Sequence, residues 1–255
     1  MEIVGLIPAG GVAERLGKLP CSKEIMPLFK NSGKIRVTSE YLIHYYKLAG
    51  IKHIYFIIRK GKWDIPQYFG DGAEHEVNIG YLIMNLPFGT PFTLNQAYPF
   101  VKDKLVAIGF PDIIFEPENA YAEIKSKLLN TKAELVLGIA PQDNYLKSDM
   151  IEFNADRSIR NIVIKQNRPD LHYSWFIAIW KPGFSEYMNK FLNDFKDKYP
   201  DGKIPIEGIS RELYVGDVIQ SALADGMKAE YVQFEKGSYL DIGTFDDLNK
   251  LILNK

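Results

Sequence analysis

The sequence predicts an α/β fold, with a mostly parallel sheet covered by helices on both faces. In the first half of the chain, short apolar runs of strand length alternate with segments of helical spacing. The runs are rich in β-branched residues and nearly all apolar, as in strands buried on both faces. No linker rich in Pro, Gly or Ser interrupts the 255 residues, so we expect one domain over 1–255.

The first half predicts a regular alternation of elements. The apolar runs predict strands at 2–8, 51–59, 75–84, 104–110 and 134–140. Helices are expected over 38–50, around 91–100 and over 117–130. The helix at 38–50 begins with Thr38 and Ser39, which can cap it, and stops at Gly50.

The second half has a different pattern. Strands at 150–154 and 159–165 flank the turn-like "NADRS", which predicts an antiparallel hairpin. Further strands are expected at 173–180 and 228–234, and helices at 183–198, 215–226 and 245–255. The segment "IPIEGISREL" reads as a loop. We therefore expect two lobes, about 1–140 and about 141–255.

Composition excludes several classes of protein. The net charge is −1, from 31 basic and 32 acidic residues, which argues against a broad nucleic-acid surface. A single cysteine, Cys21, allows no intrachain disulfide. There is no secretory signal pattern, and no apolar run reaches the ~18 residues of a membrane span. We expect a soluble cytoplasmic protein with no nucleic-acid or membrane partner, and the sequence leaves homo-oligomer formation open.

The first strand runs into a glycine pair followed by two spaced cations. Ala9, Gly10 and Gly11 come directly after the strand, and Arg15 and Lys23 follow. Ligands bind at the carboxyl ends of strands in such sheets, and glycines let the backbone approach them closely. The start of a following helix suits a phosphate. Neither the Walker loop nor the dinucleotide fingerprint is present, and a glycine pair can also serve packing alone.

The wider stretch "LIPAGGVAERL…SKEIMP" resembles the N-terminal signature of the sugar-1-phosphate nucleotidylyltransferases. These include the glucose-1-phosphate thymidylyltransferases and uridylyltransferases. The resemblance implies a Rossmann-like sheet of the nucleotide-diphospho-sugar transferase type. It assigns the nucleotide to about 1–140 and the acceptor to about 141–255. It also implies that Arg15 holds the β- and γ-phosphates and that Lys23 stabilises the α-phosphate.

The same family holds a divalent metal with two aspartates far apart in sequence. "GFPD" after a strand offers Asp112, a loose match to the family's Gly-Asp element. "DIGT" near the end offers Asp241, a close match. The resemblance implies that both hold Mg²⁺, which favours carboxylates, phosphate oxygens and water. A turn or capping role remains the alternative for each aspartate.

The segment "LPFGTPFTLNQA" resembles the family's base-binding loop, with Gly89 and Thr90 in the matching places. The residues do not identify the base. The length and layout of the chain favour dTTP or UTP.

The acceptor motif departs from the family. Lys165 matches the lysine of its Glu-Lys-Pro element, but Ile164 replaces the glutamate. Ser148 and Asp149 replace a Tyr-Gly pair, and a strand glycine is replaced near Phe176. The acceptor is therefore an unusual sugar phosphate or a phosphate that is not on a sugar. Candidates to line the altered pocket, each with packing as the alternative, are Asp149, His172, Tyr173 and Trp175.

These motifs together predict an enzyme. An NTP and a sugar 1-phosphate would give an NDP-sugar and pyrophosphate, with catalysis by positioning and charge neutralisation. Three alternatives remain open: nucleotidyl transfer to a non-sugar phosphate, a glycosyltransferase of similar fold, and a non-catalytic nucleotide-binding protein.

Overall fold

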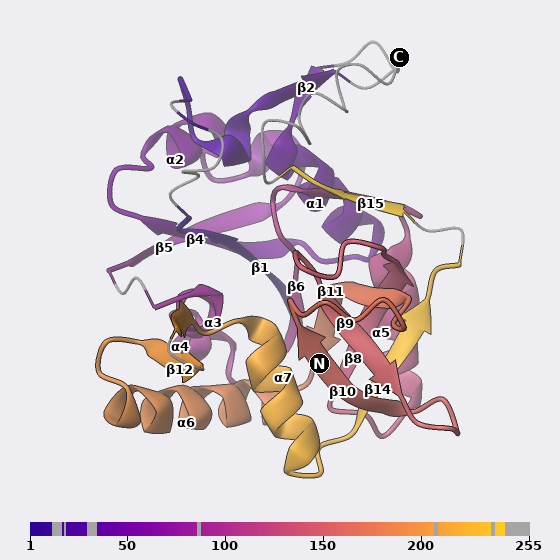
Figure 1. Ribbon diagram of the computed structural model, residues 1–255. Coiled ribbons are helices and arrows are strands. Elements are labelled where there is room, and N and C mark those ends of the chain that lie inside the picture. The colour runs from indigo at the N-terminus through magenta and orange to yellow at the C-terminus, as the bar shows by residue number, and fades with distance from the viewer. Residues whose placement is uncertain are drawn as a thin grey trace.

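The computed structural model has the expected α/β architecture, built on a nine-stranded sheet with helices on both faces (Figure 1). It describes residues 1–11, 17, 19–29, 35–85, 88–206, 209–235 and 238–242. The main path through the sheet is β10-β9-β11-β6-β1-β4-β5, and β8 joins it by pairing with β11 and β14. The helix expected at 245–255 and the segment after the glycine pair fall outside the described residues.

The described helices and strands are as follows. The helices are α1 (Thr38–Leu48), α2 (Asp64–Phe69), α3 (Thr90–Asn95), α4 (Tyr98–Val101), α5 (Ala120–Asn130), α6 (Pro182–Lys198) and α7 (Val215–Ala224), with 3₁₀ turns η2 (Lys23–Ile25) and η3 (Ala73–His75). The sheet strands are β1 (Ile3–Ala9), β4 (His53–Arg59), β5 (Asn78–Met84), β6 (Leu105–Ile108), β8 (Leu135–Pro141), β9 (Asp149–Phe153), β10 (Ile159–Ile164), β11 (Tyr173–Trp180) and β14 (Ala229–Gln233). Three small pairs complete the fold: β2 (Pro27–Phe29) with β3 (Ile35–Val37), β7 (Ile113–Glu116) with β15 (Ser238–Asp241), and β12 (Lys203–Ile206) with β13 (Ile209–Glu212).

The first half forms the parallel part of the sheet. β1 lies between β4 and β6, and β4 pairs with β5, all in parallel register. The carboxyl ends of β1 and β6 therefore meet at one edge, where ligands of such sheets bind. This edge carries the glycine loop after Ala9 and the "GFPD" segment after Ile108.

β11 connects the two halves of the molecule. It runs antiparallel to β6, β8 and β9, so the hairpin of β9 and β10 extends the same sheet. The turn at 154–158 joins β9 and β10, which confirms the hairpin predicted from "NADRS".

Two hydrophobic clusters cover the two faces of the sheet. One packs α1, α2 and α5 against it, and the other packs α3, α4, α6 and α7 against it. Successive residues of β6 alternate between the clusters, with Val106 in one and Ala107 in the other, as the period of a strand requires. No helix in the described part of the chain is both long and apolar enough to cross a membrane.

Two local expectations were wrong, and one small sheet was not foreseen. The segment "IPIEGISREL" is a short hairpin of β12 and β13 rather than a loop, since its residues pair in antiparallel register. The helix expected around 91–100 is two short helices, α3 and α4. The small sheet of β7 and β15 was not expected, because it joins segments from opposite ends of the chain.

Candidate active site

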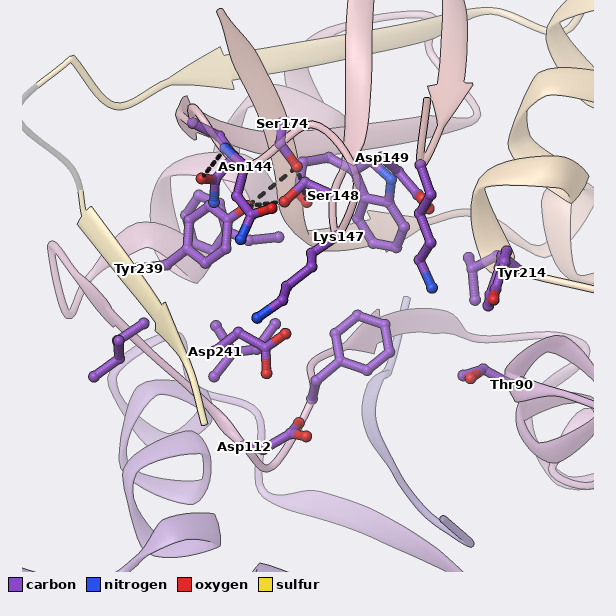
Figure 2. Close-up of a pocket in the computed structure, with 18 of the residues that line it drawn as sticks. Thr90, Asp112, Asn144, Lys147, Ser148, Asp149, Ser174, Tyr214, Tyr239 and Asp241 are labelled. Atoms are coloured by element: carbon purple, nitrogen blue, oxygen red, sulfur yellow. Dashed lines mark hydrogen bonds between the residues drawn. The ribbon is translucent and has the colours of Figure 1, made fainter. Parts of the chain in front are cut away.

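One pocket of about 430 Å³ opens between the parallel half of the sheet and the β9–β11 region (Figure 2). Six residues singled out from the sequence line it: Thr90, Asp112, Asp149, Lys165, Trp175 and Asp241. The two aspartates assigned to a metal lie on the side opposite Ser148 and Asp149 (Figure 2). The pocket therefore brings the predicted metal and acceptor residues to one place.

The small sheet of β7 and β15 explains how two distant aspartates meet. Asp241 at the end of β15 pairs with Ile113 at the start of β7. The amide of Ile242 also donates a hydrogen bond to the carbonyl of Asp112 at 2.9 Å. This ladder fixes the two aspartates beside each other at the edge where β6 ends.

The side chain of Lys23 contacts one of these two aspartates. Its ammonium donates to Oδ2 of Asp112 at 2.5 Å. Burial works to lower the pKa of Lys23, but Asp112, Glu24 and Asp241 together raise it above its usual value. Lys23 is therefore a charged ammonium close to both aspartates, as an interaction with phosphate oxygens requires.

The backbone of Lys23 is held by neighbouring polar contacts. The hydroxyl of Thr38 donates to the carbonyl of Lys23 at 2.6 Å. Ser22 donates to the Asp64 carboxylate through both its amide and its hydroxyl, at 2.7 and 2.8 Å. These contacts tie the turn that carries Lys23 to α1 and α2.

A buried ion pair lies directly behind Lys23. Glu24 accepts two hydrogen bonds from the Lys62 ammonium, at 2.6 and 2.7 Å, and the two side chains are 0% and 8% exposed. Such a pair stays charged in the interior because each ion compensates the other. It fixes the 3₁₀ turn η2 against the segment before α2.

The glycine loop is tightly packed but does not line the pocket. Ala9 is fully buried, and a Cβ on Gly10 would come 2.7 Å from Sδ of Met84, whereas Gly11 faces open space. Arg15 lies outside the described residues, so its assignment stays a prediction. The phosphate-binding role of the glycine loop also stays a prediction.

Gly89 and Thr90 begin α3 next to the pocket. Gly89 has φ +96°, and a Cβ there would come 2.4 Å from the carbonyl oxygen of Leu213. Only glycine suits both the left-handed conformation and the close approach. Thr90 lines the pocket directly after it.

The acceptor side contains a partly buried carboxylate. The pKa of Asp149 is raised to about 6, mainly by burial; Asp217 also acts to raise it, while Lys165, Arg211 and a hydrogen bond from the Trp175 indole act to lower it. Oδ1 of Asp149 and Nε1 of Trp175 are both buried. The indole acts on the carboxyl as a hydrogen-bond donor, so the two side chains are neighbours in the pocket wall.

Lys165 lies beside this carboxylate in an uncommon backbone conformation. Its φ is +47°, in the left-handed region that non-glycine residues seldom adopt outside functional sites. Its ammonium lies 3.4 Å from the centroid of the Tyr214 ring, a cation–π contact. Arg211 contacts the same ring at 5.0 Å.

A β-bulge at Phe176 shapes the wall around Trp175. Trp175 pairs with Ile139 and Ile177 pairs with Gly138, so Phe176 is the extra residue. Bulges redirect side chains next to active sites, and here both Trp175 and Phe176 line the pocket. His172 and Tyr173 do not line it, and the Tyr173 hydroxyl instead lies 3.4 Å from Glu235.

Sequence reasoning missed several residues of the pocket. Lys147 points toward Asp241 (Figure 2), and its position next to Ser148 in the altered motif could have signalled it. Oε1 of Gln142 accepts two amide hydrogen bonds that order the following loop. Tyr214 and Glu212 carried no motif, because only the packing of α7 brings them to the pocket.

The donor set suits a hard divalent cation. Asp112 and Asp241 supply carboxylates from two strands, and a Mg²⁺ ion could complete its shell with phosphate oxygens and water. Within the described ranges, no three His, Cys, Asp or Glu side chains cluster as a complete protein ligand set. The residues therefore fit a metal that is shared with a phosphate substrate.

Comparison with known proteins agrees with this geometry. Residues 4–254 match the family model described as nucleotidyl transferase. The chain is 23% identical over 258 residues to the low-salt glycan biosynthesis nucleotidyltransferase Agl11 of Haloferax volcanii, a match that spans 98% of the chain and 66% of that relative.

Solved structures share the fold. A Bacillus anthracis protein described as a glucose-1-phosphate thymidylyltransferase, solved with sucrose, has TM-score 0.82 and 20% identity, over 98% of this chain and 93% of that one. A UDP-glucose pyrophosphorylase bound to UDP-glucose has TM-score 0.78 and 15% identity, over 98% and 97%. The inositol-1-phosphate CTP transferase of T. maritima has TM-score 0.72 and 14% identity, over 98% and 92%.

The family match covers nearly the whole chain, and it confirms the resemblance seen in the first and last motifs. The chain is therefore a transferase that belongs to the nucleotidyl transferase family.

Proposed function

We propose that this nucleotidyltransferase joins an NTP to a sugar 1-phosphate or a related phosphate ester, and releases pyrophosphate. One observation supports the proposal: Asp112 and Asp241 line the same pocket as Lys165 and Asp149, and Lys23 forms an ion pair with Asp112. The first group suits a triphosphate, and the second suits a phosphorylated acceptor.

The reaction is an in-line displacement at the α-phosphorus. An oxygen of the acceptor phosphate attacks, and the bond from the α-phosphorus to the bridging oxygen breaks. Pyrophosphate leaves with the electron pair of that bond, so no protein nucleophile is required. The chain would contribute mainly orientation and charge stabilisation.

Each charged group has a proposed part. Lys23 moves from Asp112 to the α-phosphate, Arg15 holds the β- and γ-phosphates, and Lys165 holds the acceptor phosphate. Members of the family generally use a divalent metal, and we assign Mg²⁺ to Asp112 and Asp241. When bound, the ion would neutralise charge that develops on the phosphate oxygens.

The nucleotide is assigned to the part of the chain up to about 140, where Ala9, Gly10, Gly11, Gly89 and Thr90 hold it. The acceptor is assigned to the part from about 141 onward. The layout of the chain favours dTTP or UTP. The described relatives include a thymidylyltransferase, a UDP-glucose pyrophosphorylase and a CTP transferase, so the base must be measured.

A pyrophosphate-release screen tests the proposal. Each NTP is paired with sugar 1-phosphates, myo-inositol 1-phosphate, phosphocholine and phosphoethanolamine, with and without Mg²⁺. We expect Mg²⁺-dependent release that needs both an NTP and a phosphorylated acceptor. A protein that instead transfers sugar from an NDP-sugar, with no pyrophosphate from any pair, would contradict the proposal.

A further inference from the structure

The loop between β8 and β9 carries a lysine into the pocket that the sequence motifs did not select. Lys147 extends from the side of Ser148 and points toward Asp241 on the opposite side (Figure 2). Lys147 and Asp241 are both exposed, so a ligand in the pocket can reach them. The Lys147 side chain therefore crosses the space where the proposed acceptor and the proposed nucleotide meet.

The two lysines of the pocket serve different parts of it. Among the described lining residues, the basic ones are Lys147 and Lys165. The ammonium of Lys165 lies 3.4 Å from the centroid of the Tyr214 ring, and its charge acts on the Asp149 carboxyl. Lys147 is the lysine that points toward Asp241 (Figure 2). The two ammonium groups can therefore contact a phosphate from two directions.

Contacts within the chain order the loop that carries Lys147. At its start, Oε1 of Gln142 accepts hydrogen bonds from the next two backbone amides, at 3.0 and 2.9 Å. The amide of Lys147 donates to the carbonyl of Asn144 at 3.1 Å, which closes a turn. At the end of the loop, the amide of Lys165 donates to the carbonyl of Ser148 at 3.2 Å. An ammonium placed by an ordered backbone needs little reorganisation to meet its ligand.

A reaction between two phosphates favours a cation at this place. The attack brings two negative groups together, and an ammonium beside both reduces their repulsion. Lys23 contacts Asp112 on the side that we assign to the nucleotide, and Lys147 comes from the other side. An exposed lysine gains little stability from a carboxylate beside it, so its ammonium can leave Asp241 for a phosphate oxygen at small cost.

From these observations, and resting on the proposed function, we propose that Lys147 is a further catalytic residue, which binds the attacking phosphate of the acceptor where that phosphate faces the nucleotide. Lys165 would hold the same phosphate from the side of Tyr214. An acceptor oxygen forms the new bond to the α-phosphorus, and pyrophosphate leaves with the electron pair of the broken bond. The Lys147 ammonium keeps its proton and stabilises the negative charge that the two phosphates share.

The test replaces Lys147 and measures turnover, binding and stability. Lys147→Met keeps the apolar stem of the side chain and removes the charge, whereas Lys147→Arg keeps the charge. Lys196→Met and Asp197→Asn are matched control changes at exposed positions of α6 that do not line the pocket.

Three measurements are made on each protein. Pyrophosphate release gives kcat and KM for the NTP and for each phosphate ester that is active in the screen. Thermal shifts with inorganic phosphate measure binding independently of turnover. Urea unfolding measures stability.

We expect Lys147→Met to lose about 10- to 100-fold in kcat/KM for the acceptor, the range for a hydrogen bond to a charged group. Its KM for the NTP and its urea midpoint should stay at the wild-type values. It should also need more inorganic phosphate than wild type for the same thermal shift. Lys147→Arg should recover most of the loss, and both control variants should behave as wild type.

Three outcomes would overturn the inference while the proposed function stands. In the first, Lys147→Met keeps kcat/KM for the acceptor within about twofold of wild type. In the second, the KM for the NTP rises instead of that for the acceptor. In the third, Lys147→Met and Lys147→Arg are equally impaired and both have a lower urea midpoint, which would indicate a structural role.

Failure of the proposed function is a separate result. It is shown if no pair of NTP and phosphate ester releases pyrophosphate from the wild type. The thermal shifts with inorganic phosphate then decide the inference. Equal shifts for wild type and Lys147→Met would overturn it, and a shift confined to wild type would support Lys147 as a phosphate-binding residue.

Discussion

The two sides of the pocket differ in how their polar groups are satisfied. On the side of Asp112 and Asp241, Lys23 already bonds a carboxylate, and the Glu24–Lys62 pair supports it from behind. On the side of Asp149, burial raises the pKa of the carboxyl, and the Trp175 indole is its neighbour. The first side contains a direct ion pair, whereas the second contains a carboxylate whose ionised form is disfavoured by burial.

The two sides also differ in how closely they keep the sequence motifs of the family. The phosphate side keeps the family pattern in "SKEIMP" and "DIGT", and phosphate groups are the same in every NTP. The acceptor side has lost the glutamate and the Tyr-Gly pair, and its carboxylate stands on the neighbouring strand. The residues that we assign to the NTP phosphates thus include a direct ion pair, whereas the residues that we assign to the acceptor lie where the motif has changed.

The largest expected effect on turnover comes from removing a carboxylate on the side of Asp112 and Asp241. Asp241→Asn removes one of the two carboxylates that we assign to the metal but preserves the shape of the side chain. We expect turnover to fall on the order of 10²–10³-fold, as for loss of one charge-stabilising group. Pyrophosphate release at saturating substrates measures it, with Asp197→Asn as the control, and turnover within twofold of wild type would remove Asp241 from the mechanism.

The ion pair behind Lys23 should affect stability in the same region. Lys62→Met leaves the buried Glu24 carboxylate without a partner, which typically costs about 3–5 kcal/mol. Urea unfolding measures the change. The double variant Glu24→Gln with Lys62→Met should recover most of the loss, because no uncompensated charge remains. A single variant as stable as wild type would show that the pair does not organise this side.

The sequence predicted the side of the pocket with Asp112 and Asp241 better than the side with Asp149. Lys23 and Asp112 were selected from local motifs, and the structure brings their side chains into contact, while their roles stay predictions. Asp112 and Asp241 lie next to each other because of the β7–β15 ladder, a long-range pairing that was not expected; the family pattern suggested only that the two aspartates share a metal. Arg15 stays a prediction, since it lies outside the described residues.

On the side of Asp149, the sequence predicted only a set of candidate residues. Asp149 and Trp175 were selected because they flank missing motif residues, but His172 and Tyr173 were selected on the same grounds and do not line the pocket. The bulge at Phe176 brings both Trp175 and Phe176 to the pocket wall, and a bulge has no signal in a single sequence. Tyr214 reaches the pocket through tertiary packing alone.

The buried Asp149 carboxylate should lower the free energy of unfolding at neutral pH. The pKa of Asp149 is raised from 3.8 to about 6, so its favourable contribution is complete below about pH 4 and is lost as the pH rises through 6. Asp149→Asn should therefore be more stable than wild type at pH 7.5, by about 1–2 kcal/mol, with the difference shrinking toward pH 4. Urea unfolding across this range checks the sign, and a less stable variant at pH 7.5 would show that Asp149 is already satisfied without a ligand.

The smallest expected effect lies where the two sides meet. The Tyr239 hydroxyl, on the strand that carries Asp241, lies 3.2 Å from Oγ of Ser174 and 3.5 Å from Oγ of Ser148 on the acceptor side. Its ring stacks on Phe176 at a centroid distance of 5.3 Å. Tyr239→Phe keeps the stacking and removes the polar contact, so we expect a loss of about 0.5–1.5 kcal/mol in stability.

The kinetic effect of Tyr239→Phe separates two descriptions of the pocket. If the two sides act independently, the variant should raise the acceptor KM by less than about tenfold and leave the KM for the NTP unchanged. If the hydroxyl couples them, both KM values should rise together, because β15 also positions Asp241. We expect the first result, since the β7–β15 ladder and Lys23 hold the phosphate side without any contribution from Tyr239.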